Sequence, residues 1–285
     1  MSARSPVRLV GVALVRNEDV FVERAIRNAA GACDRIHAFD HVSTDGTWPM
    51  LKTLSKELDH LEVRRCANAA ESHRQLEQYA ATPSWVLRID GDHLFDPNGL
   101  RVLREALLAG EHGDVFRVRA HALHCDELDE EAGLAWGYMA PPSRTGVQLY
   151  NLGAVTSWPG GIEALHGGDP QYRAGYAWDR MRDLTESTDW QSDPLRLLHV
   201  CFLRRSSLDT DAFAPGRLNL NEQGTYRRGL AGKLRRLVRR PHIDPRVRDL
   251  HERGTNWKQD KYRRGPRVSV DATPFLVLGQ LDAAL

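Results

Sequence analysis

The stretch from Trp85 to Pro97, W-V-L-R-I-D-G-D-H-L-F-D-P, carries the pattern that decides the fold. Its first residues are apolar and favour β-structure, and they stop at D-G-D, residues 90–92. In a parallel sheet covered by helices, the carboxyl ends of the strands face the crevice in which ligands bind. Two carboxylates beside His93 suit a hard divalent cation such as Mg²⁺ or Mn²⁺, which takes oxygen ligands. The same residues also suit a surface turn, because Asp and Gly are ordinary turn residues.

Length and composition are those of a soluble globular protein, with 285 residues of which 41% are hydrophobic and 27% charged. This length allows one large α/β domain and an appendage. The four cysteines are widely spaced and form no C-x-x-C pair, so we expect reduced thiols in the core. No signal-peptide pattern and no apolar run of transmembrane length is present, which predicts a cytoplasmic protein.

Positive charge is concentrated toward the end of the chain. Between Gly224 and Arg267 fifteen Lys or Arg stand against four acids, so this segment carries +11 and the remainder −10. Within it, residues 229–240 place leucines along one side of a helix and cations elsewhere. Such a helix can lie on the anionic inner face of a membrane, or it can pack on the domain through its leucines. Nucleic acid is disfavoured as a partner, because no RNP, zinc-finger or aromatic-interleaved pattern accompanies the charge.

Strand and helix patterns alternate before the central stretch. Arg8 to Val15 is a continuous apolar run without helical period, which is typical of a strand buried on both faces. Further strands are expected at 35–39, 61–63 and 85–89, and helices at 20–30, 50–58 and 71–81. The resulting βαβαβαβ order predicts a parallel sheet covered on both faces.

The expected strands end in polar side chains that can contact a ligand. Asn17 and Glu18 follow the first strand, Asp40 ends the second, and Asp90 and Asp92 follow the fourth. We expect these groups to converge at one edge of the sheet.

Three segments in this half of the chain resemble motifs of the family 2 glycosyltransferases. V-A-L-V-R-N-E-D, residues 12–19, is similar to their first strand and N-E pair, and F-D-H-V-S-T-D-G-T, residues 39–47, is similar to V-D-D-G-S-T-D-G-T. Residues 72–92 resemble A-R-N-x-G-x-x-x-A-T-G-E-Y-I-x-F-L-D-x-D, with Arg74 at the same distance from the first aspartate. His41 departs from the pattern, because it replaces the second family aspartate.

The resemblance implies a GT-A fold, which is α/β with a Rossmann-like, mostly parallel sheet covered by helices on both faces. It implies a glycosyltransferase domain over residues 1–213, with a nucleotide-sugar-binding half at 1–100 and an acceptor half at 101–213. A basic, helical C-terminal extension would follow at 214–285.

The resemblance also implies roles for individual side chains. The pocket for a nucleotide-diphosphate sugar would be lined by Val15, Asn17, Glu18, Asp40, Arg74 and Asp90. A Mn²⁺ or Mg²⁺ ion would be bound by Asp90, Asp92 and His199. His199 interrupts the apolar run L-R-L-L-H-V-C-F-L, residues 195–203, so a satisfied core histidine is the alternative for it.

Beyond Pro97 the resemblance weakens, and the expectations come from local patterns. A helix is predicted over 100–108, and strands over 114–120, 146–152, 154–158 and 195–203. The acidic run C-D-E-L-D-E-E, residues 125–131, is expected to be a solvated loop.

The glycine-rich segment 159–168 is the second region expected to carry chemistry. Related sugar transferases carry a similar stretch beneath the acceptor, so Trp158, Glu163 and His166 are candidates by position. An indole could stack on a sugar, and a carboxylate could deprotonate a hydroxyl. Asp179 is a second candidate base, and a flexible loop with exposed His and Glu is the alternative for the segment.

The sequence therefore predicts metal-dependent, inverting transfer of a sugar from a nucleotide-diphosphate donor to a hydroxyl of a sugar, lipid-linked or small-molecule acceptor. Two alternatives stay open. A nucleotidyltransferase of similar fold would release pyrophosphate instead of a nucleoside diphosphate. A catalytically inactive GT-A-like module would bind the sugar nucleotide without turnover.

Overall fold

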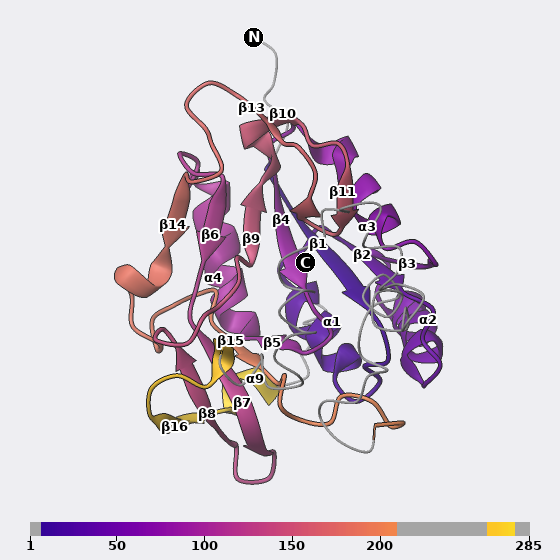
Figure 1. Ribbon diagram of the computed structural model, residues 1–285, viewed down its shortest axis with the longest axis vertical. Coiled ribbons are helices and arrows are strands. Elements are labelled where there is room, and N and C mark those ends of the chain that lie inside the picture. The colour runs from indigo at the N-terminus through magenta and orange to yellow at the C-terminus, as the bar shows by residue number, and fades with distance from the viewer. Residues whose placement is uncertain (1–6, 210–260, 277–285) are drawn as a thin grey trace, which may run out of the picture.

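The computed structural model describes residues 7–209 and 261–276, and its core is a seven-stranded sheet beside a five-stranded sheet (Figure 1). The strands of the larger sheet, in spatial order, are β14 (Met181–Asp183), β6 (Arg117–Arg119), β9 (Leu149–Asn151), β4 (Ser84–Ile89), β1 (Arg8–Val15), β2 (Arg35–Asp40) and β3 (Leu61–Arg65). Within this sheet, β9 is antiparallel to its neighbours and the other pairs are parallel.

The smaller sheet is mixed. Its strands, in spatial order, are β16 (Arg267–Asp271), β8 (Leu134–Ala140), β7 (Ala122–Asp129), β15 (Leu197–His199) and β5 (His93–Phe95). Two short ribbons pair β10 (Val155–Ser157) with β13 (Gln171–Tyr172) and β11 (Gly161–Glu163) with β12 (His166–Gly167). The helices are α1 (Val22–Ala30), α2 (Thr47–Glu57), α3 (Ala70–Arg74), α4 (Pro97–Leu108) and α9 (Thr273–Leu276), with 3₁₀ turns η1 (Glu77–Tyr79), η2 (Leu152–Ala154) and η3 (Leu184–Glu186).

The larger sheet is buried on both faces, as the apolar run of β1 predicts. Leu9 and Ala13 pack into a core that includes the apolar sides of α1, α2 and α4. Val10 and Val12 point the other way, into a second core with Leu76 before η1. Successive side chains of a strand alternate between faces, so a strand covered on both sides needs apolar residues at nearly every position.

The predicted elements of the first hundred residues are confirmed, with one difference. The helix expected over 71–81 ends at Arg74, and a separate turn, η1, follows. This break lets Leu76 and Tyr79 pack beneath the sheet. After Pro97, α4 begins three residues before its predicted range, and the strands β6, β9, β10 and β15 lie within theirs but keep only three residues each.

The prediction of a loop over residues 125–131 is wrong, although most side chains of this run are exposed as expected. Most of this run belongs to β7, which pairs with β8. The side chains of Asp126 and Glu127 accept hydrogen bonds from Arg267 of β16. The acidic charges are therefore neutralised in part by a strand that lies about 140 residues later in the chain.

The end of the chain contributes to the body of the protein. Within the segment expected to form an extension, β16 adds an edge strand to the smaller sheet, and the Phe275 side chain of α9 is fully buried. Asn28 Nδ2 of α1 donates hydrogen bonds to the carbonyl oxygens of Phe95 and Phe275 at 2.8 and 2.9 Å. The predicted basic helix at 229–240 lies outside the described residues.

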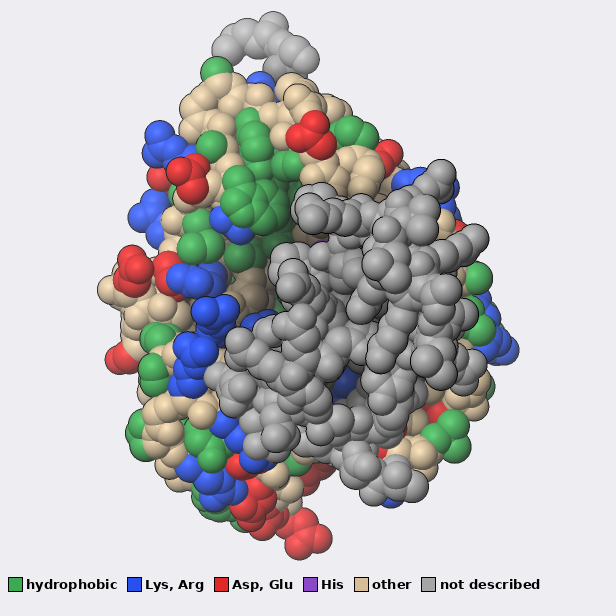
Figure 2. All heavy atoms as spheres, viewed as in Figure 1, with side chains coloured by type: hydrophobic (Ala, Val, Ile, Leu, Met, Phe, Trp, Pro, Cys, Tyr) green, Lys and Arg blue, Asp and Glu red, His purple; other side chains and the backbone are tan. Residues whose placement is uncertain are grey.

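The surface of the described part combines apolar and cationic groups. Figure 2 shows hydrophobic side chains gathered in the upper part of this face, beside a band of Lys and Arg. The ring of Trp178, which is 46% exposed, lies under the guanidinium of Arg117 at 4.1 Å. All four cysteines are buried and free, as predicted. Among the described helices, none combines the length and apolar character needed to cross a bilayer.

Replacing Phe275 with Ala should destabilise the whole domain, because the ring is buried against Trp190 at a centroid distance of 5.6 Å. Truncating a buried phenylalanine costs about 3–5 kcal/mol of unfolding free energy. Urea unfolding measures the change. Val102→Ala, at an exposed position of α4, is the control and should change the unfolding free energy by no more than about 0.5 kcal/mol. Equal stability of the two variants would mean that the end of the chain is a separate appendage.

Candidate functional site

The site lies where the order in which strands are added to the sheet reverses. From β1 the chain builds β2 and β3 on one side and then crosses to place β4 on the other side of β1. Ligands of open α/β sheets bind at such a switch point, outside the carboxyl ends of the strands. The two strand ends are in close contact here, since a Cβ atom at Gly91 would lie 2.1 Å from Glu18 Oε2. A larger residue at this position would displace the Glu18 side chain.

Asp90 forms a two-point ion pair with the preceding cation of its own strand. Arg88 Nε donates to Asp90 Oδ1 at 3.0 Å, and Arg88 Nη2 donates to Oδ2. Burial alone would raise the pKa of Asp90, but Arg88 and the adjacent His93 lower it. Asp90 is thus held as a carboxylate, and about a quarter of its side chain stays exposed.

Asp92 is more deeply buried and shares a guanidinium with Glu18. Arg205 Nη1 donates to Asp92 Oδ2, and it donates to Glu18 Oε1 at 3.0 Å. Burial opposes ionisation of Asp92, but Arg205 and then His199 hold the pKa of this carboxyl well below its usual range. The strand ends therefore carry two buried acids that share one arginine, and His199 adds to the compensation at Asp92.

Arg205 reaches this position because its segment is attached to the loops after β1 and β2. Its carbonyl oxygen accepts from the backbone N–H of Val20 at 3.0 Å. Ser206 Oγ donates to Asp45 Oδ2 at 2.6 Å, and the backbone N–H of Ser207 donates to Asp19 Oδ1 at 2.7 Å. The site is thus assembled from segments nearly 190 residues apart.

Three histidines line the smaller sheet beside the two aspartates. In the strand register, His199 of β15 is opposite His93 of β5 on one side and His124 of β7 on the other. The rings of His93 and His199 are 5.0 Å apart, and His199 Nε2 lies 3.5 Å from Asp92 Oδ2. Burial opposes the charged form of His199, but Cys201 and Asp92 outweigh it and raise its pKa to about 9.

Asp92, His93 and His199 could hold a divalent cation, since one ligand atom from each lies within 4.8 Å of the others. His93 Nδ1 is buried and has no hydrogen-bond partner among the described residues. Burial lowers the pKa of His93 to about 4, so its ring is neutral at pH 7 and offers a lone pair. An unpaired buried nitrogen beside a carboxylate fits a metal ligand, because such groups are otherwise costly to bury.

The glycine-rich segment lies next to the first aspartate. Arg88 Nη1 donates to His166 Nε2 at 3.3 Å, and His166 Nδ1 lies 3.0 Å from the carbonyl oxygen of Ala164 and 3.6 Å from Glu163 Oε1. Glu163, His166, Arg88 and Asp90 thus form a continuous polar chain. α3 holds the segment in place, because Ser72 Oγ accepts from the N–H of Ala164 at 2.9 Å and His73 Nε2 donates to the carbonyl oxygen of Trp158.

The other polar groups predicted at strand ends take part in local bonds. Asn17 adopts a positive φ of 51°, which asparagine tolerates, and its Oδ1 accepts from the N–H of Thr44 at 2.8 Å. Asp40 is fully buried, accepts from the N–H of Ser43 and pairs with Arg65 Nε at 3.0 Å.

The hydrogen bonds of Asn17 and Asp40 tie the ends of β1 and β2 together. Val15 is buried at the end of β1, and its carbonyl oxygen accepts from the N–H of His41. A contact between Asp40 and a nucleotide stays a prediction.

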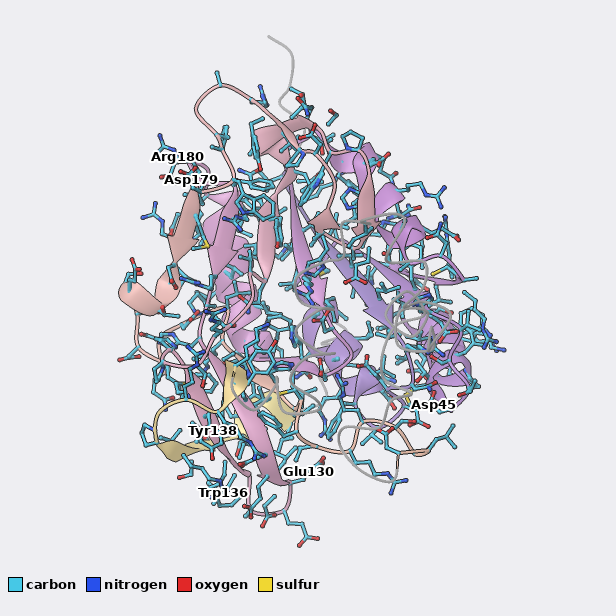
Figure 3. The ribbon with its side chains drawn as sticks, viewed as in Figure 1. Asp45, Glu130, Trp136, Tyr138, Asp179 and Arg180 are labelled. Atoms are coloured by element: carbon cyan, nitrogen blue, oxygen red, sulfur yellow. The ribbon has the colours of Figure 1, made fainter. Side chains whose placement is uncertain are left out.

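Three predicted candidates lie away from this cluster. Arg74 is exposed at the end of α3. Asp179 is exposed just before β14, at the edge of the sheet opposite to the carboxyl end of β4 (Figure 3). The proposed stacking of Trp158 on a sugar is contradicted by its burial in the second core, where Nε1 donates to the carbonyl oxygen of Gly167.

Sequence patterns did not reveal the partners that complete the site. Arg205 follows the apolar run of His199 without a motif of its own, and His124 lies in a strand with no distinguishing motif. Tyr262, whose ring is 4.3 Å from that of His124, comes from the basic part of the chain. Only the pairing of distant strands brings these residues together.

Arg205→Ala should be strongly destabilising, because it leaves Asp92 and Glu18 buried without their cation. Removing one partner of a buried ion pair costs about 3–5 kcal/mol. Arg204→Ala is the matched control, since Arg204 donates to the backbone carbonyl oxygens of Ser206 and Ser207 and its removal should cost about 1 kcal/mol or less. Equal losses in chemical unfolding would show that Arg205 does not compensate the acids.

No family model matches this chain, and no curated protein matches it. Solved structures that are similar to this chain at low identity include the following two. One is mannosyltransferase PcManGT from Pyrobaculum calidifontis in complex with GDP-Man and Mn²⁺, with 15% identity, a TM-score of 0.37 and coverage of 91% of this chain and 73% of that chain. The other is UDP-glucose pyrophosphorylase complexed with UDP-glucose, with 11% identity, a TM-score of 0.24 and coverage of 52% and 72%. Both likenesses are distant.

Proposed function

We propose that this protein is a metal-dependent glycosyltransferase of GT-A type, which moves a sugar from a nucleotide-diphosphate donor to an acceptor hydroxyl. The observation that supports it most is the meeting of Asp92, His93 and His199 at the switch point between β1 and β4, with Asp90 3.4 Å from His93 Nε2. A diphosphate and its counter-ion suit this part of the molecule, because it combines a carboxylate, two neighbouring arginines and a set of metal-ligating side chains.

The donor set favours Mn²⁺ over Mg²⁺. Asp92, His93 and His199 would hold the ion through one carboxylate and two imidazoles. Mg²⁺ prefers oxygen ligands alone, whereas Mn²⁺ also accepts imidazole nitrogen. When bound, the ion supplies Lewis-acid stabilisation of the negative charge that grows on the leaving diphosphate.

Cations of the chain itself would support the same charge. Arg88 is held by Asp90 and Arg205 by Asp92 and Glu18, so both guanidinium groups are fixed at the strand ends. A guanidinium can pair with two phosphate oxygens at once. We expect Arg88 and Arg205 to orient the diphosphate while their carboxylate partners keep them in place.

Glu163 is the proposed base. It would take the proton of the acceptor hydroxyl as that oxygen bonds to the anomeric carbon, while the bond from the carbon to the diphosphate breaks. Its carboxylate faces His166, which contacts Arg88, so the base is linked to the phosphate-binding groups. Asp179 is the less supported candidate, because it lies at the opposite edge of the sheet.

Asp92→Asn should abolish Mn²⁺-dependent binding of the donor. Calorimetric titration with GDP- and UDP-sugars, with and without Mn²⁺, should show tight binding only with the ion in the wild type. Asp179→Asn is the matched control and should bind as the wild type does. Unchanged Mn²⁺-dependent binding by Asp92→Asn would remove this residue from the metal site, and release of pyrophosphate instead of nucleoside diphosphate in product analysis would identify a nucleotidyltransferase.

Glu163→Gln should lower kcat by about 10²–10⁴-fold with little change in donor affinity, since general-base catalysis contributes that much and the amide keeps the shape. Asp179→Asn should leave kcat within about twofold, because surface substitutions remote from a site have little effect. The reverse pattern in steady-state kinetics would assign the base to Asp179.

A further inference from the structure

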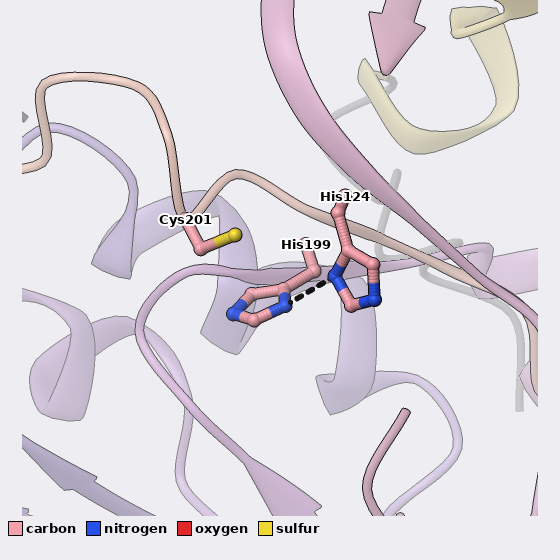
Figure 4. A group of neighbouring side chains, drawn as sticks. All are labelled: His124, His199 and Cys201. Carbon is pink, nitrogen blue, oxygen red and sulfur yellow. Dashed lines mark hydrogen bonds between the residues drawn. The ribbon is translucent and has the colours of Figure 1, made fainter. Parts of the chain in front are cut away.

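A second group of metal-ligating side chains lies directly behind His199. His124, His199 and Cys201 each offer one ligand atom, and these atoms lie within 4.8 Å of one another. Figure 4 shows the Cys201 thiol and the two imidazole rings turned toward a common space. His124 and Cys201 are fully buried, and the ring of Tyr262 covers that of His124.

The hydrogen bonds of the two histidines determine which nitrogens face this space. His124 Nε2 lies 2.9 Å from the carbonyl oxygen of Arg144, which can only accept, so Nε2 carries a proton. In the neutral ring, Nδ1 then bears a lone pair, and it faces His199 Nδ1 at 2.9 Å. The pKa of His124 is held well below its usual range by burial first and by His199 second, which keeps this ring neutral.

His199 has a corresponding arrangement on its other side. Its Nε2 faces the carboxylate of Asp92 at 3.5 Å, and its Nδ1 points to His124. Metal-binding histidines usually donate their remote N–H to a carboxylate or a backbone carbonyl, which fixes the ring and its tautomer. Both partners are present here: Asp92 for His199 and the Arg144 carbonyl for His124.

We propose that His124 Nδ1, His199 Nδ1 and Cys201 Sγ form a binding site for a borderline-soft divalent cation of the Zn²⁺ class. Two imidazoles and a thiolate are typical ligands of Zn²⁺, and water would fill the fourth position. Zn–N bonds of about 2.0–2.1 Å separate two tetrahedral nitrogen ligands by about 3.3 Å. The facing Nδ1 atoms need to part by only a few tenths of an ångström from their present 2.9 Å. On binding, the Cys201 thiol and the Nδ1 of His199 each release one proton to solvent.

Zn²⁺ at this site would regulate Mn²⁺ binding at the site of the proposed function. This regulatory role rests on that function. His199 offers Nε2 to the group with Asp92 and His93, and Nδ1 to the group with His124 and Cys201. With Zn²⁺ on Nδ1, the neutral ring keeps its proton on Nε2, where Asp92 accepts it. That nitrogen then has no lone pair for Mn²⁺, so Zn²⁺ should antagonise Mn²⁺ binding.

Co²⁺ is the probe for the test, because it occupies Zn²⁺ sites and gives a near-ultraviolet charge-transfer band when a thiolate binds it. The full-length wild type should develop this band at one equivalent of Co²⁺, and one equivalent of Zn²⁺ should remove it. Cys201→Ala should abolish the band, whereas Cys33→Ala, which changes another buried free cysteine, should retain it. Absence of the band from the wild type, or its persistence in Cys201→Ala, would overturn the proposal.

Mn²⁺ binding, followed by electron paramagnetic resonance, separates this site from the proposed donor site. Zn²⁺ should weaken Mn²⁺ binding at least tenfold more in the wild type than in Cys201→Ala, where only direct competition for the Mn²⁺ ligands remains. Asp92→Asn should lose Mn²⁺ and keep the Co²⁺–thiolate band. If Mn²⁺ binds but the band is absent, the zinc site fails alone; if the band forms but Mn²⁺ does not bind, the metal site of the proposed function fails alone.

Discussion

The sharing of the Arg205 guanidinium by two buried acids is the interaction on which the edge of the sheet with the candidate site depends. Glu18 and Asp92 lie just beyond the ends of the adjacent parallel strands β1 and β4, where the Glu18 side chain packs against Gly91. Two neighbouring carboxylates in a low-dielectric environment repel each other strongly unless a cation joins them. The guanidinium supplies that cation and fixes the segment that follows β15.

The contact of Arg205 with the two acids is also related to the position of the smaller sheet beside the larger one. β15 ends just before the segment that carries Arg205, and it lies between β5 and β7. Its position brings His199 beside the carboxylate of Asp92 on one side and beside His124 on the other. The position of β15 therefore brings Arg205 to the buried acids of the larger sheet and also aligns the histidines of the smaller sheet.

The polar groups at the strand ends divide into two kinds. Asn17 and Asp40 satisfy backbone N–H groups of the loop after β2, and so maintain the shape of the crevice. Asp90, His93 and Glu163 keep exposed oxygens or an unpaired nitrogen, which is the condition for binding something else. Burial and pairing, more than residue type, separate the structural groups from the candidates for chemistry.

The sequence by itself determined the first half of the sheet and the acids at its edge. Continuous apolar runs such as Arg8–Val15 favour strands buried on both faces, and amphipathic spacing identifies the helices between them, because both signals are local. The position of Asp90 and Asp92 follows from the same local pattern, since they directly succeed β4.

The tertiary structure alone decided which groups complete the site. The pairing of β5, β15 and β7, the return of Arg205 and the burial of Trp158 depend on contacts between residues 75 to 187 positions apart. No local periodicity encodes such contacts, because they arise when distant strands find their register and when buried charges find a partner. The acidic run at 125–131 is the clearest example: its composition indicates an exposed loop, and most of it is indeed exposed, yet pairing with β8 and Arg267 makes residues 125–129 part of a sheet.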